Sequence, residues 1–197
     1  MNKEINELLD QIKKLESELL DTIQNQQQNQ DYHIEKKRIL FNRVVKNQHR
    51  NYLQNLIDYL SNASPGNILT APVIWAVVIP AVLLDISVST YQLICFPVYG
   101  IPKVKRSDYI VFDRHYLSYL NFIEKINCAY CSYFNGMIAY VQEIAARTEQ
   151  YWCPIKHARR ISSIHSRYQN FLDYGDAKAY RSQKEKIRRQ FDDLSAK

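Results

Sequence analysis

The chain contains little glycine, proline and cysteine. Its 197 residues include only 4 Gly, 6 Pro and 4 Cys, whereas Leu, Ile, Tyr and Gln are abundant. So few turn-forming residues argue against a β fold with many tight turns. The length suits one domain with extensions, or two small units, and allows an ordinary core. We therefore predict a mostly α fold.

The sequence also lacks the common catalytic and phosphate-binding patterns. It has no Glu-x-x-His pair, no His-Glu-x-x-His, no Gly-rich phosphate loop and no Gly-x-Ser-x-Gly elbow. Glu143, Arg147 and Glu149 are spaced for ion pairs along one helix. We predict that such pairs stabilise that helix, and the sequence gives no support for an enzyme.

Acidic residues are missing from residues 36–50, which contain six basic ones, whereas acidic residues dominate before residue 36. The six are Lys36, Lys37, Arg38, Arg43, Lys46 and Arg50. Basic residues again outnumber acidic ones from Lys103 onward. Such regions attract the phosphates of lipid headgroups or nucleic acids, or they are simply solvated helix faces. The charge alone does not choose between these.

Apolar residues at alternating spacings of three and four predict an amphipathic helix over residues 4–23. They are Ile5, Leu8, Ile12, Leu15 and Leu19, an a/d pattern over about two and a half heptads. This row either pairs with a second copy or a partner helix, or packs against the protein's own helices. A Gln-rich tract at residues 24–30 follows, either as more helix or as a linker.

A second amphipathic pattern covers residues 33–60, where basic residues fall between apolar ones. This composition is typical of a helix that lies on an anionic membrane surface or packs against a partner helix. The sequence Ser61-Asn62-Ala63-Ser64-Pro65-Gly66 ends the pattern. We predict one basic amphipathic helix here.

Only one ionisable side chain, Asp85, lies within residues 67–102. A helix from Ile68 to Phe96 exceeds the roughly 20 apolar residues that cross a bilayer, and Pro80 is expected to kink it. We predict membrane insertion, either as a single span or as a re-entrant or monotopic hairpin that turns near Pro80. A buried helix pair in a soluble core is the alternative. Because basic residues flank both ends, the topology stays open.

Asp85 has two interpretations in this segment. Inside hydrocarbon an ionisable residue costs roughly 2.5 to 3.5 kcal/mol and usually faces protein or water, as in a proton relay or an interhelical contact. Ser87, Ser89 and Thr90 would then supply nearby donors. Alternatively, the span ends near Leu84 and Asp85 lies at headgroup depth.

Four residues in the C-terminal third have metal-ligand spacing: Cys128, Cys131, Cys153 and His157. They form a Cys-x2-Cys pair and a Cys-Pro-x-x-His pair, which together can bind one tetrahedral ion. We predict a structural Zn²⁺ site; iron, an iron–sulfur cluster, a redox Cys pair and unligated thiols are the alternatives. Metal-bound cysteines must stay reduced and no secretory signal precedes them, so we expect this module to face the cytoplasm. Cys95, in the apolar segment, is expected to act as a small hydrophobe.

The connection between the two pairs sets a geometric condition. Residues 132–151 have a helical pattern, and a straight helix of about 30 Å would separate Cys131 from Cys153. One shared site therefore requires that the chain folds back through residues 145–152; otherwise the two pairs serve different sites. Pro154 suits the first turn of a new helix, which would place Cys153 at its N-cap and favour the thiolate.

Two segments carry a resemblance to other proteins. They run Cys95-Phe96-Pro97-Val98-Tyr99-Gly100-Ile101-Pro102-Lys103 and Arg147-Thr148-Glu149-Gln150-Tyr151-Trp152-Cys153-Pro154-Ile155-Lys156-His157. Over residues 65–175 the chain resembles a group of small uncharacterised bacterial membrane-associated proteins with the Cys-x2-Cys and Trp-Cys-Pro-Ile-Lys-His motifs. The resemblance implies a bacterial source and an inner-membrane setting, and it implies no activity.

Together the patterns predict five regions and a non-catalytic role. The regions are a coiled-coil-like helix with a Gln-rich linker (1–31), a basic amphipathic helix (32–64), an apolar membrane segment (65–102), a helical Cys/His metal module (103–176) and a basic tail helix (177–197). We predict a membrane-associated, zinc-binding adaptor or scaffold whose partners are membrane lipid and a second copy or helical protein; nucleic acid is not expected. The alternatives are a membrane-bound electron-transfer protein with iron at the Cys/His site, and a soluble zinc protein that binds nucleic acid.

Overall fold

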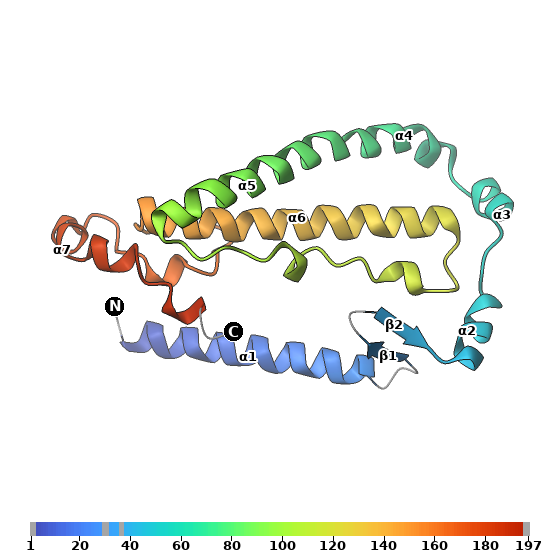
Figure 1. Ribbon diagram of the computed structural model, residues 1–197, viewed down its shortest axis with the longest axis horizontal. Helices are drawn as coiled ribbons and strands as arrows, with labels where there is room; N and C mark the ends of the chain where they lie inside the picture. The colour runs from blue at the N-terminus through green and yellow to red at the C-terminus, as the bar shows by residue number, and fades with distance from the viewer. Residues whose placement is uncertain (1–2, 29–31, 36–37, 195–197) are drawn as a thin grey trace. The chain divides into compact units, whose positions relative to one another are not determined.

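The computed structural model describes residues 3–28, 32–35 and 38–194, which are mostly helical (Figure 1). The predicted mostly α fold is confirmed. The contacts divide the chain into two units, residues 1–59 with 113–125 and residues 60–112 with 126–197. Asn29 and Gln30 of the Gln-rich tract, and the basic residues Lys36 and Lys37, lie outside the described residues.

In the first unit, α1 (Lys3–Gln28) is one uninterrupted helix of 26 residues. It contains the predicted apolar row, and the Gln-rich tract continues the helix as far as Gln28. Leu8, Ile12, Leu15 and Leu19 of the row are exposed, and the side chain of Ile5 lies outside the described part. The helix is therefore confirmed, whereas its pairing with another helix stays a prediction.

The described residues in this range, 32–35 and 38–64, do not form the single basic helix that their pattern predicted. They form two antiparallel strands, β1 (Tyr32–Glu35) and β2 (Arg38–Phe41), and then α2 (Arg43–Arg50) and α3 (Leu56–Ser61). Tyr32 is opposite Phe41 in the hairpin, with their ring centroids 5.6 Å apart. Because aromatic and β-branched residues stabilise cross-strand pairs, local pairing prevails here over helical periodicity. Asn42 then caps α2 by accepting from the Val44 N–H at 3.4 Å.

In the second unit, α4 (Pro65–Ala76) and α5 (Val78–Tyr99) follow one bowed course with a break at Val77 (Figure 1). Pro80 has no N–H to donate to the Ala76 carbonyl, which accounts for the break three residues before it. Val77 itself has right-handed helical angles, φ −67° and ψ −16°. The helix is thus irregular one turn before Pro80, where a kink was predicted. The helix continues past Pro80, so the turn of a hairpin does not occur there.

The chain reverses direction at Gly100, which ends α5. Gly100 has a φ of 69°, and the Ile101 N–H donates to the Phe96 carbonyl at 2.9 Å, as in a Schellman motif. Phe96 and Ile101 are both buried in the main apolar cluster, so the contact that accompanies this motif is present. Residues 101–112, the return segment, then run back beside α5 and α6.

Helix α6 (Phe122–Trp152) is the longest helix described, with 31 residues. Asn121 caps it: its Oδ1 accepts from the Glu124 N–H at 3.0 Å, and Glu124 Oε2 accepts from the Asn121 N–H at 2.8 Å. Tyr130 contacts Trp75 of α4, and Tyr151 stacks on Tyr99 at the end of α5. The two long helices are therefore parallel, with the return segment as the reversed connection.

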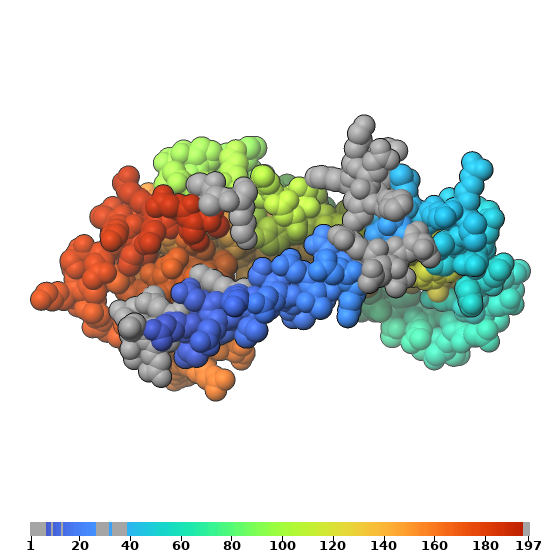
Figure 2. All heavy atoms as spheres, turned by 90° about the horizontal axis from the view of Figure 1, so that it is seen from below, coloured from blue at the N-terminus to red at the C-terminus, as the bar shows by residue number. Residues whose placement is uncertain are grey.

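The C-terminal residues fold against the end of α6. Ile155 and Leu172 form an isolated parallel bridge, and α7 (Ala177–Ile187) follows a turn at Gly175. The orange and red atoms of these residues form one continuous block in Figure 2. The helix expected in the tail is thus present over residues 177–187, and residues 195–197 lie outside the described part.

Candidate functional site

The structure does not bring the four predicted metal ligands together. Cys128 and Cys131 lie one turn apart inside α6, and Cys153 follows directly after its last residue. Cys153 comes 22 positions after Cys131, and because α6 is unbroken between them, they lie about 33 Å apart along its axis at 1.5 Å per residue. Among the residues that the structure describes, no group of three or more His, Cys, Asp or Glu side chains is placed to hold a metal ion. The residues do not fit one tetrahedral ion in this arrangement.

The surroundings of Cys153 also differ from the prediction. Pro154 ends α6 instead of starting a new helix, and the Cys153 N–H donates to the Glu149 carbonyl at 2.7 Å. Cys153 therefore lies at the C-terminal end of α6 and not at the N-cap of a new helix. His157 is exposed in the following loop, where its backbone N–H donates to the Tyr168 hydroxyl at 2.8 Å. Cys131 and Cys153 are exposed, and Cys95 and Cys128 are half-buried.

A network of polar side chains lies on the inner side of α5, and we call it the polar seam. Its members are Asp85, Ser89, Gln92, Arg106, Tyr133 and Tyr140. Asp85 is 8% exposed and accepts from Arg106 Nη2 at 2.7 Å, from the Tyr133 hydroxyl at 3.0 Å and from Ser89 Oγ at 3.3 Å. Asp85, the one residue of the apolar segment that carries a charge at neutral pH, is therefore paired and hydrogen-bonded inside the protein, as buried charges require.

Gln92, two helical turns after Asp85, bonds the return segment to α5. Its Oε1 accepts from the Val104 N–H at 3.0 Å, and its Nε2 donates to the Val104 carbonyl at 3.3 Å. The Gln92 amide also donates to the hydroxyl of Tyr140, a fully buried residue of α6. One side chain thus satisfies both backbone polar groups of Val104, in a segment where the described regular structure is one short 3-10 turn, Arg106–Asp108.

The opposite side of α5 and most of α4 expose apolar side chains, which we call the apolar surface. It consists of Ile68, Leu69, Val73, Ile74, Ile79, Leu83, Ile86, Leu93, Ile94 and Val98. Soluble proteins bury such residues and expose polar ones, whereas α5 buries Asp85 and Gln92 and exposes Leu83 and Ile94. The 35 residues Pro65–Tyr99 are long and apolar enough to cross a membrane.

Hydrogen bonds and burial shift the pKa values of three groups in and near the polar seam. Hydrogen bonding to Asp85 raises the pKa of the Arg106 guanidinium, although partial burial opposes this effect. Burial raises the pKa of the Tyr133 phenol, and the bond to Asp85 adds to the increase. Burial likewise raises the pKa of Tyr109, with a smaller contribution from the charge of Glu143. Arg106 is therefore cationic, and both phenols keep their protons, at neutral pH.

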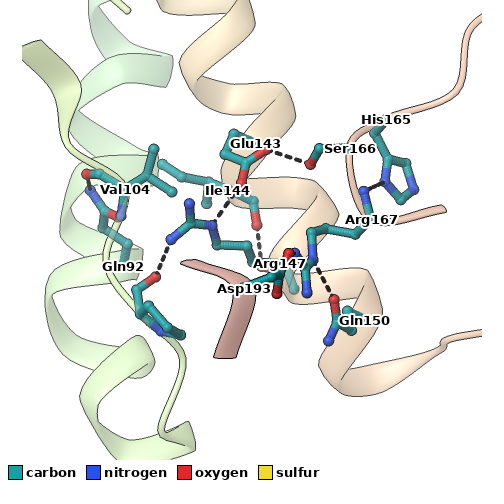
Figure 3. Close-up of polar contacts among 12 residues, drawn as sticks. Gln92, Val104, Glu143, Ile144, Arg147, Gln150, His165, Ser166, Arg167 and Asp193 are labelled. Atoms are coloured by element: carbon teal, nitrogen blue, oxygen red, sulfur yellow. Dashed lines mark hydrogen bonds and ion pairs between the residues drawn. The ribbon is translucent and has the colours of Figure 1, made fainter. Parts of the chain in front are cut away.

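Glu143 and Arg147 form the ion pair that their spacing predicted, but the pair is buried. Arg147 Nε donates to Glu143 Oε1 at 2.8 Å, and its Nη1 donates to the Pro102 carbonyl at 2.7 Å (Figure 3). The other carboxylate oxygen of Glu143 accepts from Ser166 Oγ at 2.6 Å. The pair therefore connects the return segment, α6 and the C-terminal loop.

Arg167 is a buried cation that the sequence pattern did not reveal. Its side chain is 2% exposed and donates to Gln150 Oε1 at 2.6 Å, to the Gln190 carbonyl at 2.8 Å and to Asp193 (Figure 3). Gln150, also fully buried, donates to the Ile187 and Gln190 carbonyls at 2.9 and 2.7 Å. These bonds hold the last described residues against α6 and so stabilise the C-terminal part of the fold.

The first unit contains a hollow lined by basic side chains. Lys46 and Arg50 of α2 and Lys125 of α6 line it, together with His115, in a volume of about 550 Å³. Lys46 and Arg50, from the basic stretch of residues 36–50, thus line the same hollow as Lys125, which is distant in sequence. The positive charge of the hollow attracts anionic groups such as phosphates.

Comparison with known proteins adds no assignment. No protein-family model matches the chain, and searches of curated proteins and of solved structures find no match either. The resemblance to small bacterial membrane-associated proteins therefore stays a prediction.

Proposed function

We propose that this protein is a membrane-attached scaffold that binds lipid through the apolar surface of α4 and α5. The observation that carries the proposal is the reversed distribution of side chains on α5. Asp85 and Gln92 face the return segment of the same chain, whereas Leu83, Ile86 and Ile94 are exposed on the outside. In water the outward face would cost about 25 cal/mol for each Å² of exposed apolar area, whereas in lipid the cost disappears.

The scaffold part of the proposal rests on α1. Leu8, Ile12, Leu15 and Leu19 form an exposed row along a helix of about 39 Å, the length of 26 residues. A row with this spacing is suited to pair with the same row of a second copy or with another amphipathic helix. The protein would then use one helix for a protein partner and another for the membrane.

Membrane fractionation tests the attachment. We expect the protein to stay with membranes through washes with high salt and alkaline carbonate, and to be released by detergent. Leu83→Asp with Ile86→Asp should shift it to the supernatant, because two carboxylates would enter lipid. Ala139→Asp, at an exposed position of α6, is the matched control and should leave the distribution unchanged. Wild-type protein in the carbonate supernatant would contradict the proposal.

Zinc binding by Cys128, Cys131, Cys153 and His157 remains a separate prediction. It requires α6 to break between Cys131 and Cys153, because the unbroken helix keeps them about 33 Å apart. Membrane attachment through the apolar surface does not depend on this metal, so the two ideas can fail independently.

A further inference from the structure

Charged residues of the return segment lie beside the middle of α5. The Val104 backbone is bonded to Gln92, and Arg106 is bonded to Asp85. Lys103 and Lys105 flank Val104, and both side chains are exposed. Asp108, two residues after Arg106, is exposed as well. Hydrogen bonds therefore fix where these charged residues lie along the axis of α5.

This placement conflicts with an upright span. About 20 helical residues cross the hydrocarbon layer, and every 20-residue stretch within Pro65–Tyr99 contains Asp85, except the first, 65–84, which ends next to it. Most upright placements would therefore carry exposed Lys105 and Asp108 into hydrocarbon. Exposed charges are costly to place there, so they usually face protein or water.

The first stretch, 65–84, meets a different difficulty. The Tyr130 hydroxyl of α6 donates to the Ile74 carbonyl at 3.1 Å, which places Tyr130 near the middle of that stretch. Asn127, one turn before Tyr130, is exposed. An upright α4 would therefore bring the exposed Asn127 of α6 close to the centre of the bilayer, where polar side chains are costly.

The charges are instead arranged for a helix that lies flat. Asp85 and Gln92 point toward the return segment and α6, and Leu83 and Ile94 are on the opposite side of α5. Exposed apolar side chains therefore lie on the side of α5 that faces away from the return segment, and the return segment carries Lys103 and Lys105. Helices with this arrangement lie in the membrane interface, with the apolar face about 5 to 10 Å deep.

We propose that α4 and α5 lie parallel to the plane of the membrane, with the apolar surface in one leaflet and Lys103 and Lys105 among anionic lipid headgroups. The inference rests on the proposed membrane attachment and adds its geometry and lipid class. No part of α4 or α5 crosses to the far side. The bilayer is contacted from one side only, and the segments before α4 and after α5 remain on that same side.

Nitroxide labels along the apolar surface measure this geometry. The four native cysteines are replaced by Ser, and single cysteines are introduced in place of Ile79, Leu83, Ile86 or Ile94. The full-length protein is bound to vesicles of phosphatidylcholine and phosphatidylglycerol, and label depth is measured by collision with oxygen and with a water-soluble nickel complex. Circular dichroism checks that each variant keeps its helix content.

The two orientations predict different depth profiles. Between Ile79 and Ile94 the helix axis advances about 22 Å, so an upright helix requires depths that change steadily across that range. A flat helix predicts depths without a steady trend along the sequence, which differ by no more than about 5 Å, the diameter of the cylinder of Cα atoms. A steady gradient would overturn the flat orientation but leave membrane attachment standing. If every label lay in water or against protein in the presence of vesicles, as in a soluble dimer, both the flat orientation and the membrane attachment would be overturned.

Charge reversal tests the headgroup contact in the protein with its native cysteines. Lys103→Glu with Lys105→Glu should weaken binding to phosphatidylglycerol vesicles by at least about tenfold, since each cation near an anionic surface contributes about fivefold. Binding to pure phosphatidylcholine vesicles should not change. Lys178→Glu with Lys186→Glu, two exposed positions of α7, makes the same change in net charge and serves as the control. Equal loss in both double variants would overturn the headgroup contact.

Discussion

Arg106 Nη2 lies 2.7 Å from Asp85 Oδ2, and this ion pair joins the return segment to the middle of α5. The Asp85 carboxylate is buried, whereas the Arg106 side chain is 45% exposed. Tyr133 and Ser89 supply further hydrogen bonds to the same carboxylate. The pair therefore neutralises the one charge of the apolar segment and fixes the course of the chain after Gly100.

A double-mutant cycle at this pair should show coupling. We expect Asp85→Asn and Arg106→Gln each to lower the free energy of unfolding in detergent by about 1 to 2 kcal/mol, because each leaves a polar partner unpaired. The double variant should lose less than the sum, with a coupling of at least about 0.5 kcal/mol. The exposed pair Lys14 and Glu18, at 3.7 Å, is the control and should show almost none. Additive losses at Asp85 and Arg106 would disprove the pair.

Gly136→Ala should destabilise the protein, although alanine is the better helix former. A Cβ at Gly136 would lie 2.4 Å from the Tyr109 carbonyl oxygen and 2.9 Å from Ile110 Cα. We expect a net loss of about 1 to 2 kcal/mol, since overpacking outweighs the gain of about 1 kcal/mol in helix propensity. Ala139→Gly, at an exposed position of α6, reports propensity alone. If thermal unfolding of Gly136→Ala occurred at a higher temperature, the close approach of the return segment would be refuted.

Arg167→Lys should not be a conservative change. Lysine keeps the charge but cannot donate to Gln150, Gln190 and Asp193 in the geometry of the guanidinium. We expect a loss of about 2 kcal/mol and faster proteolysis after α6, because buried acceptors are left unpaired. The same substitution at the exposed Arg181 should change stability by less than about 0.5 kcal/mol. Limited proteolysis with mass spectrometry measures the release of the C-terminal segment.

The Lys156 and Asp173 ion pair predicts a small dependence of stability on pH. The hydrogen bond from Lys156 Nζ, 2.7 Å long, lowers the pKa of the Asp173 carboxyl. Because the folded pKa is below the unfolded value of about 3.9, the contribution is present above that pH and is lost as the pH falls through the folded pKa. Carbon NMR titration should show the Asp173 pKa rising in Lys156→Met. It should stay unchanged in Lys178→Met, where the replaced amine belongs to α7.

Metal analysis decides between the predicted zinc site and the separation that α6 imposes. With α6 intact, we expect Cys128→Ser and His157→Ala to leave the zinc content of the purified protein unchanged. A stoichiometric ion that is lost in both variants would mean that α6 breaks between Cys131 and Cys153. Visible absorbance of the same samples would identify iron instead.

Local patterns were sufficient for several elements. The spacing of Leu8, Ile12 and Leu15 predicted α1, and Pro80 predicted the irregularity between α4 and α5. These features depend on residues within one or two turns, which the sequence lists in order. The same reasoning was wrong for residues 32–35 and 38–41, because the cross-strand pairing of Tyr32 with Phe41 competes with helical periodicity.

The Cys-x2-Cys segment shows a second limit. The spacing of Cys128 and Cys131 predicted a pair of metal ligands, yet Ala129 and Tyr130 between them contain no helix breaker and α6 runs through all four residues. Helix propensity and the capping box at Asn121 and Glu124 act locally and favour one long helix. A metal site needs convergence of distant residues, which ligand spacing alone does not ensure.

The amino-acid sequence by itself determined a long apolar segment with a single ionisable residue, a mostly helical chain and an amphipathic N-terminal helix. These follow from composition and from the period of the apolar residues. Only the tertiary structure decided that Asp85 meets Arg106 and that α5 turns its polar side inward. The reason is physical: the reversal at Gly100 sets which side chains meet across 21 residues of sequence, and no local pattern encodes that pairing.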